Sequence, residues 1–434
     1  MTFSPASLRD FLQILERRSE LRAVPTSVDP MYEISAHLAL NGAGPALRFD
    51  NVAGSGMRVV GNLLCSRERI AAGLGVPLQQ LQSHIVRAIA APLDPAPARS
   101  APCQEVVEEN PDLATLPIPT FFEHETGPYI TAGIIAACDA QTGKANLSYA
   151  RLKPLGGNRA FIGIAPNHHL AVMARRAKTL PIAVTLGNSP AVMIAAALYL
   201  GYGEDELRVA GALQGAPIET IKCFASQIVV PASCEMVLEG VLRTDATVEE
   251  GLVSEYHGLY ENYGAGYVVE FSHLTRRRDA MLQVIQPGYH PEHVWIGAEA
   301  IAAGLAASLA TPVAITPGGA GRLHAVVALK GGDARELIRK IWDTVHLVKH
   351  VTVVDADIDA WDATRVELAI ATCMRADRDL LVEPAMPSNR SDPQARGGKV
   401  PKLGIDATRK VGERDWTPAA PPLAVLEKIR KTLT

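Results

Sequence analysis

Two glutamates, Glu250 and Glu255, carry the clearest chemical signal in this sequence when they are read beside the segment 146–151, which ends in Arg151. Glu255 stands among serine, tyrosine, histidine and glycine, and the run 250–258 contains no lysine or arginine. If Glu255 is buried, it must find a distant cation or hold its proton. A carboxylic acid that keeps a proton near neutral pH is what proton-transfer chemistry needs. The alternative is a pair of exposed glutamates beside a glycine turn, because glutamate is mostly a surface residue.

Three further side chains have the types and contexts of metal ligands, namely Asn146, His168 and Glu206. Asn146 follows an expected strand, and Glu206 ends a short acidic run. An imidazole, an amide and a carboxylate form a mixed nitrogen and oxygen set. Such a set suits Mn²⁺ or Mg²⁺ completed by phosphate oxygens better than a closed zinc site. The alternatives are a helix N-cap at 167–168 and a solvated acidic turn at 204–206.

Composition and charge argue against several classes of partner. The net charge of −4 gives no basic footprint for nucleic acid or for an anionic membrane. The six cysteines lie far apart without a Cys-x-x-Cys pair, which argues against a disulfide framework and a structural zinc site. No signal-peptide pattern opens the sequence, and no apolar run approaches ~20 residues. The expectation is a cytoplasmic protein that binds neither nucleic acid nor membrane.

The pattern of apolar and turn residues predicts about three α/β parts, in line with a prior of one domain per ~150 residues. The first part combines a helix capped at Ser4, short strands at 46–49 and 57–61, and a helix at 67–88. A linker follows between 91 and 119, where the many prolines are incompatible with a central strand or a helix.

The middle of the chain predicts a sheet, and the last third predicts alternating helices and strands. Strand patterns between 129 and 285, interrupted by helices at 169–178 and 190–200, are typical of a β-barrel or a layered sheet. In the last third we expect strands at 312–315, 324–329 and 351–354 and helices at 295–309, 333–347 and 360–371. This alternation predicts a βαβ unit with a parallel sheet. After residue 378 we expect a proline- and glycine-rich tail that docks on a neighbouring domain or subunit, with a final helix at 423–434.

A succession of short blocks makes the chain resemble a known family. The blocks are 116–119 (Leu-Pro-Ile-Pro), 127–133 (Gly-Pro-Tyr-Ile-Thr-Ala-Gly), 146–151 (Asn-Leu-Ser-Tyr-Ala-Arg), 166–168 (Pro-Asn-His), 231–235 (Pro-Ala-Ser-Cys-Glu), 250–258 (Glu-Gly-Leu-Val-Ser-Glu-Tyr-His-Gly) and 402–408 (Lys-Leu-Gly-Ile-Asp-Ala-Thr). In this order and spacing, from about residue 5 to 410, the chain resembles the UbiD-like decarboxylases, which use prenylated FMN. The match of all blocks in register is far more specific than any one block.

The resemblance implies a mixed α/β (α+β) architecture built around a flavin-binding domain. That domain would be a split β-barrel at 111–300, like that of flavin reductases. It would be flanked by an N-terminal α/β domain with the proline-rich linker at 1–110 and by a C-terminal α/β domain at 301–410. A tail helix would occupy 411–434.

The resemblance also implies prenylated FMN, Mn²⁺ (or Mg²⁺) and K⁺ as cofactors, and it assigns roles to residues. The catalytic network would be Arg151, Glu250 and Glu255, with Glu255 as the proton donor. The metal would be bound by Asn146, His168 and Glu206. The cofactor-binding set would be Asn146, Leu147, Ser148, Tyr149, Ala150, Arg151, Asn167, His168, Glu206 and a basic group near the cofactor phosphate, either Lys349 or His350. A guanidinium beside two carboxylates makes physical sense, because it orients one while the other serves as an acid.

The implied function is a reversible, non-oxidative decarboxylation of an aromatic, heteroaromatic or α,β-unsaturated carboxylic acid. The partners would be this small-molecule acid, CO₂, a flavin prenyltransferase that supplies the cofactor, and further copies of the chain in a homodimer or higher homo-oligomer. One alternative is an FMN-dependent reductase, which would need a nicotinamide site and no acid pair. Another is a non-catalytic subunit of a multi-part carboxylase, against which the presence of Arg151, Glu250 and Glu255 weighs.

Overall fold

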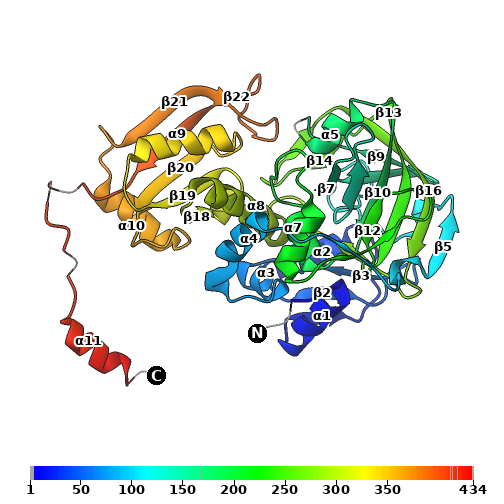
Figure 1. Ribbon diagram of the computed structural model, residues 1–434, viewed down its shortest axis with the longest axis horizontal. Coiled ribbons are helices and arrows are strands. Elements are labelled where there is room, and N and C mark those ends of the chain that lie inside the picture. The colour runs from blue at the N-terminus through cyan, green and yellow to red at the C-terminus, as the bar shows by residue number, and fades with distance from the viewer. Residues whose placement is uncertain (1–3, 167, 411, 413, 418, 433–434) are drawn as a thin grey trace.

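The structure is a computed structural model that describes residues 4–166, 168–410, 412, 414–417 and 419–432. Helices and sheets are mixed throughout these residues, which confirms the predicted α/β class. In Figure 1 the N-terminal segments and the large sheet pack together, while the C-terminal sheet forms a separate layer beyond helix α8. No helix in the described part of the chain combines the length and apolar character needed to span a bilayer.

The N-terminal part contains a four-stranded sheet with strand order β1-β2-β3-β17. Its elements are α1 (Leu8–Arg17), β1 (Leu21–Val24), α2 (Glu33–Asn41), β2 (Ala46–Phe49), β3 (Arg58–Gly61), α3 (Arg67–Gly73), η1 (Leu78–Gln80), α4 (Leu81–Ala90) and the late strand β17 (Met281–Val284). The cap of α1 is Ser7, whose side chain accepts a hydrogen bond from the backbone of Asp10, and not Ser4 as predicted. The single helix predicted at 67–88 was also wrong, since Gly75 adopts φ +67° and Pro77 follows, so the chain forms α3 and α4 instead.

The central part is an eight-stranded sheet in which every pairing is antiparallel. Its main path runs β7-β6-β10-β13-β16-β9-β8, and β5 pairs with β16. The elements of this region are β4 (Ala96–Pro97), η2 (Pro102–Gln104), β5 (Val106–Glu109), η3 (Leu113–Thr115), β6 (Ile134–Cys138), β7 (Ala145–Tyr149), β8 (Leu152–Gly156), β9 (Arg159–Ile162), α5 (His169–Ala174), β10 (Thr179–Leu186), α6 (Pro190–Ala195), α7 (Glu206–Gln214), β11 (Glu219–Lys222), β12 (Val229–Pro231), β13 (Met236–Glu249), β14 (Leu252–Ser254), β15 (Tyr260–Asn262) and β16 (Ala265–Arg276).

The two end strands of this sheet, β7 and β8, follow each other in the chain and are separated only by Ala150 and Arg151. The sheet must therefore curl until its ends approach each other. No ladder joins β7 to β8 among the described residues, so a closed barrel is not observed. The buried side of the curled sheet is apolar and includes Val184, Leu238 and Phe271, which are fully buried. This packing gives the β7–β8 link a rigid support.

The C-terminal part is a five-stranded sheet with strand order β18-β19-β20-β22-β21. Its elements are α8 (Pro291–Leu309), β18 (Val313–Ile315), η4 (Pro317–Gly319), β19 (His324–Leu329), α9 (Ala334–Thr344), β20 (His350–Asp355), α10 (Ala363–Cys373), β21 (Leu380–Pro387), β22 (Lys399–Asp406) and α11 (Leu423–Arg430). The predicted βαβ unit is confirmed, because strands β19 and β20 pair in parallel and helix α9 lies between them in the chain. The two outer strands, β18 and β21, are antiparallel to their neighbours, so the sheet is mixed.

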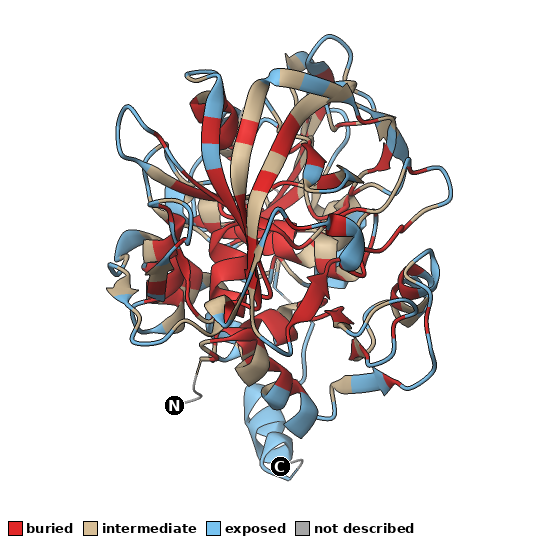
Figure 2. Cartoon of the chain, turned by 90° about the vertical axis from the view of Figure 1, so that its right-hand side faces the viewer, coloured by how far each residue is buried: buried red, intermediate tan, exposed pale blue. Residues whose placement is uncertain are grey.

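The segment predicted as a loop-like tail after residue 378 instead contains the β21–β22 hairpin. Its loop reaches back to the rest of the molecule, since Tyr256 donates a hydrogen bond of 3.0 Å to the carbonyl of Ser391. The helix α11 lies apart from the body of the molecule (Figure 1). Buried residues are concentrated in the strands of the body, whereas α11 is exposed along its length (Figure 2).

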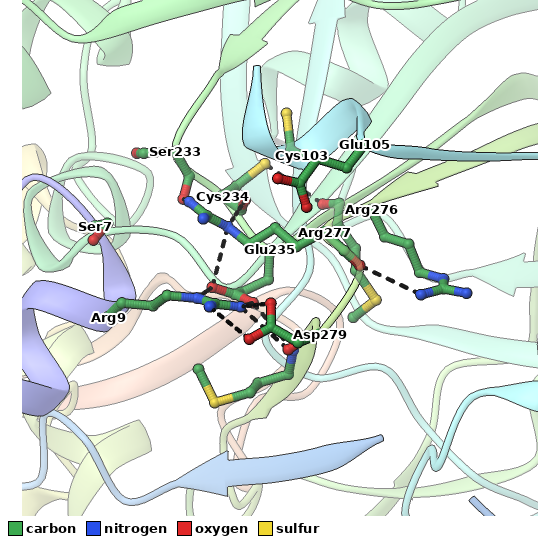
Figure 3. Close-up of polar contacts among 12 residues, drawn as sticks. Ser7, Arg9, Cys103, Glu105, Ser233, Cys234, Glu235, Arg276, Arg277 and Asp279 are labelled. Carbon is green, nitrogen blue, oxygen red and sulfur yellow. Dashed lines mark hydrogen bonds and ion pairs between the residues drawn. The ribbon is translucent and has the colours of Figure 1, made fainter. Parts of the chain in front are cut away.

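An ion-pair cluster fastens helix α1 to the central sheet (Figure 3). The fully buried carboxylate of Glu235, just before β13, accepts hydrogen bonds of 2.8 and 2.9 Å from Arg9 and lies 3.4 Å from Arg277. Arg9 also binds the exposed carboxylate of Asp279 at 2.8 Å. Because the buried carboxylate of Glu235 contacts both arginines, it is the central residue of this cluster.

Replacing Glu235 by Ala is therefore expected to lower the free energy of unfolding by about 1–3 kcal/mol, because it removes the buried acceptor of Arg9 and leaves the backbone N–H of Met281 without a partner. Asp279→Ala removes a carboxylate that is 63% exposed and should cost less than about 1 kcal/mol. Urea or thermal unfolding of the two variants checks this order. Equal effects of the two substitutions would contradict the role given to Glu235.

Helix α8 begins at a buried histidine that must be neutral. His290 caps the helix, where its Nδ1 accepts a hydrogen bond from the backbone of Glu292 and its Nε2 lies 3.1 Å from the carbonyl of Leu38. Burial lowers the pKa of His290 to about 4. Protonation would remove the acceptor that caps the helix.

His290 should make the protein sensitive to acid. The unfolded chain takes up this proton near pH ~6.5, whereas the folded chain does so only near pH 4. The stability due to neutral His290 is therefore complete above pH ~6.5 and is lost as the pH falls toward 4, by at most about 1.4 kcal/mol per pH unit. Urea unfolding at pH 7 and pH 5 should show a smaller loss for His290→Asn than for the unmodified protein. Equal losses would exclude His290 as a source of the acid sensitivity.

Candidate active site

A cavity of about 400 Å³ opens between the central sheet, the start of α8 and the loop of the β21–β22 hairpin. Strand β7 and the link that follows it form one wall, from Asn146 to Arg151. The segment that contains Glu255, the first turns of α8 and the loop residues 389–391 form the others. Parts of the chain that are far apart in sequence thus meet around one space large enough for a ligand.

Arg151 joins both predicted glutamates at the wall of this cavity. Its Nε and Nη2 donate to the two carboxylate oxygens of Glu250 at 2.5 and 2.8 Å, and its Nη1 lies 3.4 Å from Oε1 of Glu255. Burial opposes the charge of Arg151, but the hydrogen bonds and charge of Glu250 and the charge of Glu255 more than offset it and raise the guanidinium pKa. Arg151 is therefore a fixed cation between two carboxylates, as the sequence predicted.

The backbone explains why these side chains converge. Arg151 stands on the two-residue link between the end strands of the sheet, and Glu250 follows directly after β13. Gly251 adopts φ +83°, a conformation that turns the chain just after Glu250 and that glycine accommodates best. The carbonyl of Glu250 accepts a hydrogen bond of 2.6 Å from the hydroxyl of Thr126, which holds this turn. Glu250 is 1% exposed, whereas the Glu255 side chain is 14% exposed and lines the cavity.

The three predicted metal ligands, Asn146, His168 and Glu206, line the same cavity. Glu206 lies in the first turn of α7 and accepts a hydrogen bond of 2.7 Å from the backbone of Leu147. Burial raises the pKa of Glu206 to about 8. Burial, helped by the charges of His169 and Arg390, lowers the pKa of His168. The set therefore offers a neutral imidazole and a buried carboxylate.

This donor set fits a divalent cation with hard oxygen ligands. No basic side chain of the described residues pairs with the buried Glu206, and Asn146 would contribute its amide oxygen as a ligand. A bound cation would stabilise the ionised form of Glu206 and use the imidazole in the neutral form that metals require. Where the chain is described, no three His, Cys, Asp or Glu side chains gather as a metal site, so the amide and a ligand from the cofactor would have to complete this one.

The other predicted cofactor-binding residues divide into three groups. Leu147, Ser148, Tyr149 and Ala150 line the cavity, and the hydroxyl of Ser148 is buried without a hydrogen-bond partner among the described residues. Asn167 lies outside the described residues. Lys349 and His350 are absent from the described lining of the cavity.

Lys349 instead lies 3.5 Å from the buried carboxylate of Asp392, in the hairpin loop. The ring of His350 packs against that of His324, with 6.1 Å between centroids. Contact of either residue with a cofactor phosphate stays a prediction. In this structure Lys349 anchors the loop that carries residues 389–391 to the cavity.

Several residues of the cavity were missed from the sequence, above all Arg390, Arg322, His293 and Tyr263. Arg390 extends from the hairpin loop so that its guanidinium lies 4.4 Å from the centroid of the Tyr263 ring. The sequence around Arg390 predicted a proline- and glycine-rich tail that docks on a neighbouring domain or subunit, and not the wall of a cavity. The only local signal was an arginine between Asn389 and Ser391 in a proline-bounded turn, which does not by itself point to a cavity.

Comparisons with known proteins agree on one family. Three models of 3-octaprenyl-4-hydroxybenzoate carboxy-lyase (UbiD) match the chain: the N-terminal domain at residues 12–89, the Rift-related domain at 96–290 and the C-terminal domain at 301–407. Anhydromevalonate phosphate decarboxylase from Methanosarcina mazei is 33% identical over 421 residues, which are 94% of this chain and 97% of that protein.

Solved structures give the same result. The UbiD-class enzyme HmfF from Pelotomaculum thermopropionicum, in complex with FMN, is 34% identical and superimposes with a TM-score of 0.91 over 98% of this chain and 99% of that one. An evolved dimeric form of HmfF in complex with prenylated FMN is 33% identical, with a TM-score of 0.87 over 97% and 100% of the two chains.

Proposed function

This chain belongs to the UbiD family and is a carboxy-lyase, and we propose that it releases CO₂ without net oxidation from an aromatic, heteroaromatic or α,β-unsaturated acid by means of bound prenylated FMN. The observation that carries the proposal is the contact of Arg151 with both Glu250 and Glu255 at the wall of the cavity. A fixed cation between two carboxylates, one buried and one facing a cavity, is suited to hold an acid and move a proton.

The cofactor proposal rests on the relatives and on the fit of the cavity. HmfF has been solved with FMN and with prenylated FMN. Asn146, His168 and Glu206 would hold Mn²⁺ or Mg²⁺ at the phosphate end of such a cofactor, and Arg390 supplies a further positive charge there. When bound, prenylated FMN would act as a sink for the electrons left by the departing CO₂. We also propose K⁺, without assigned ligands.

Each residue of the network has a distinct role in this proposal. Glu250 fixes the Nε side of Arg151, so that Nη1 remains directed toward Glu255 and the substrate carboxylate. The bond between the substrate carbon and its carboxylate breaks, and CO₂ leaves. Glu255 then donates its proton to that carbon, and the reverse sequence carboxylates the product. Closure of the cavity from bulk water would protect the carbanion equivalent before the proton arrives.

Finer features of the family complete the proposal. We propose that the curled central sheet is a split β-barrel, which the two-residue link between its end strands supports. The domain boundaries near residues 110, 300 and 410 are proposed as well. A homo-oligomer is supported by the evolved dimeric form of HmfF. A flavin prenyltransferase as cofactor supplier and a cytoplasmic location stay predictions.

The test is to purify the protein after co-expression with a flavin prenyltransferase, to record the mass of the released cofactor, and to follow CO₂ release from a panel of aromatic and unsaturated acids. We expect prenylated FMN and CO₂ release from at least one acid. Unmodified FMN with oxidation of NADH would favour an FMN-dependent reductase. Bound cofactor and metal without turnover of any acid would favour a non-catalytic subunit of a multi-part carboxylase.

A further inference from the structure

Arg322 is a cavity residue that the proposed mechanism does not use. It follows the short helix η4 and precedes β19, so it comes from the C-terminal part of the chain. Its Nη1 is buried and has no hydrogen-bond partner among the described residues. No carboxylate of the described chain forms an ion pair with it. A buried guanidinium nitrogen without a partner is costly, so such a group is expected to meet an anion.

The surrounding residues hold this guanidinium in place. It lies 5.2 Å from the centroid of the Tyr256 ring, a cation–π contact. It also lies against Gly297 of α8, where an added Cβ would fall 1.2 Å from Nη1. Any larger residue at position 297 would displace Arg322. The absence of a side chain there lets the guanidinium reach the cavity wall.

Arg322 lies at the end of the cavity where the reaction is proposed. Tyr256 is the residue directly after Glu255. His293 lines the cavity nearby, and the charges of both Arg322 and Arg151 act on it in addition to its burial. The proposed metal and phosphate end is formed by other residues, with Arg390 as the adjacent cation. The phosphate of a bound cofactor would therefore lie at the other end of the cavity and would not occupy Arg322.

We propose that Arg322 binds a second anionic group of the substrate, a carboxylate or a phosphate, while Arg151 holds the carboxylate that is lost. This inference rests on the proposed function and narrows its substrate class to acids with two anionic groups. One relative, anhydromevalonate phosphate decarboxylase, is named for a substrate that carries a phosphate. A guanidinium suits either group, because it offers parallel donors to two oxygens.

The test compares matched acids that differ only in the second group. One pair is anhydromevalonate phosphate and anhydromevalonate, and the other is benzene-1,4-dicarboxylate and benzoate. Affinity is measured by calorimetry on the cofactor-loaded protein, and KM and kcat are measured wherever CO₂ is released. The variants are Arg322→Gln, Arg322→Lys and, as a matched control, Arg159→Gln, which changes an exposed arginine outside the cavity.

We expect the unmodified protein to prefer the dianionic member of at least one pair, and that pair identifies the group. Arg322→Gln should weaken binding of this dianion by about 10- to 100-fold, with little change for its monoanionic partner and for cofactor content. Arg322→Lys should restore part of the preference, because it keeps the charge but loses the parallel donors. Arg159→Gln should leave both affinities unchanged.

The proposal is overturned if neither pair shows a dianion preference, if Arg322→Gln weakens both members equally, or if it mainly reduces bound cofactor. The last result would assign Arg322 to the flavin. Failure of the proposed function would look different: no acid would lose CO₂ in the loaded protein, yet a dianion preference that depends on Arg322 would remain in calorimetry. Poor folding of Arg322→Gln does not remove the test, because Arg322→Lys and the matched acids still report on it.

Discussion

Glu255→Gln should lower the rate of CO₂ release by about 10²- to 10⁴-fold, the range expected when a general acid is removed. The reason is geometric, since Glu255 is the carboxylate of the pair that lines the cavity, whereas Glu250 is fully engaged by Arg151. Glutamine has nearly the same shape but no transferable carboxylic proton. Steady-state CO₂ release, with cofactor content measured on the same sample, checks the expectation.

The matched control for this prediction is Glu249→Gln, which changes an exposed glutamate beside Glu250 but outside the described lining of the cavity. It should leave turnover and bound cofactor unchanged. Glu255→Gln should also keep the cofactor, because its loss would move the effect from chemistry to binding. Undiminished turnover in Glu255→Gln would remove this residue from its proposed role.

Glu206→Ala and His168→Ala should each lose metal and flavin together and, with them, all measurable decarboxylation. Glu206 and His168 are the only carboxylate and imidazole of the proposed metal set, and that set has few ligands to spare. Metal analysis of the purified variants and their flavin absorbance measure the two losses. Full retention of both metal and flavin would defeat the assignment.

Two further substitutions separate the charge of Glu206 from its structural bond. Glu206→Gln can still accept the hydrogen bond from the backbone of Leu147 but lacks the negative charge, so it should also lose metal. Glu204→Ala changes an exposed glutamate of the same acidic run and should keep both metal and flavin. If Glu206→Gln keeps the metal, the Glu206 carboxylate stabilises the fold of β7 and does not bind the ion.

The residues that meet at this site were easier to predict from the sequence than the fold that holds them. Arg151, Glu250 and Glu255 are recognisable because a segment with acids and no local cation needs a distant partner, and the structure provides it. Asn146, His168 and Glu206 come together in one cavity as predicted. Their roles depend on ligands that side-chain geometry alone does not reveal, so those roles stay proposals.

The parts that were not predicted depend on long-range packing. The β21–β22 hairpin brings Arg390 to the cavity, yet its strands are partly exposed and rich in turn residues, so local propensity favoured a tail. The position of Arg322 likewise depends on its contacts with Tyr256 and Gly297, and no spacing in the sequence predicts those contacts. The break between α3 and α4 was the one local feature that Gly75 and Pro77 could have indicated.

In the proposed site, the acid network and the metal trio face one flavin from opposite ends of the same cavity. A crystal structure of the protein loaded with prenylated FMN and Mn²⁺, with diffraction recorded at the manganese absorption edge, tests it most directly. We expect one anomalous peak among Asn146, His168 and Glu206, with the flavin ring beside Arg151 and Glu255. An anomalous peak elsewhere, or a flavin bound outside this cavity, would contradict the account.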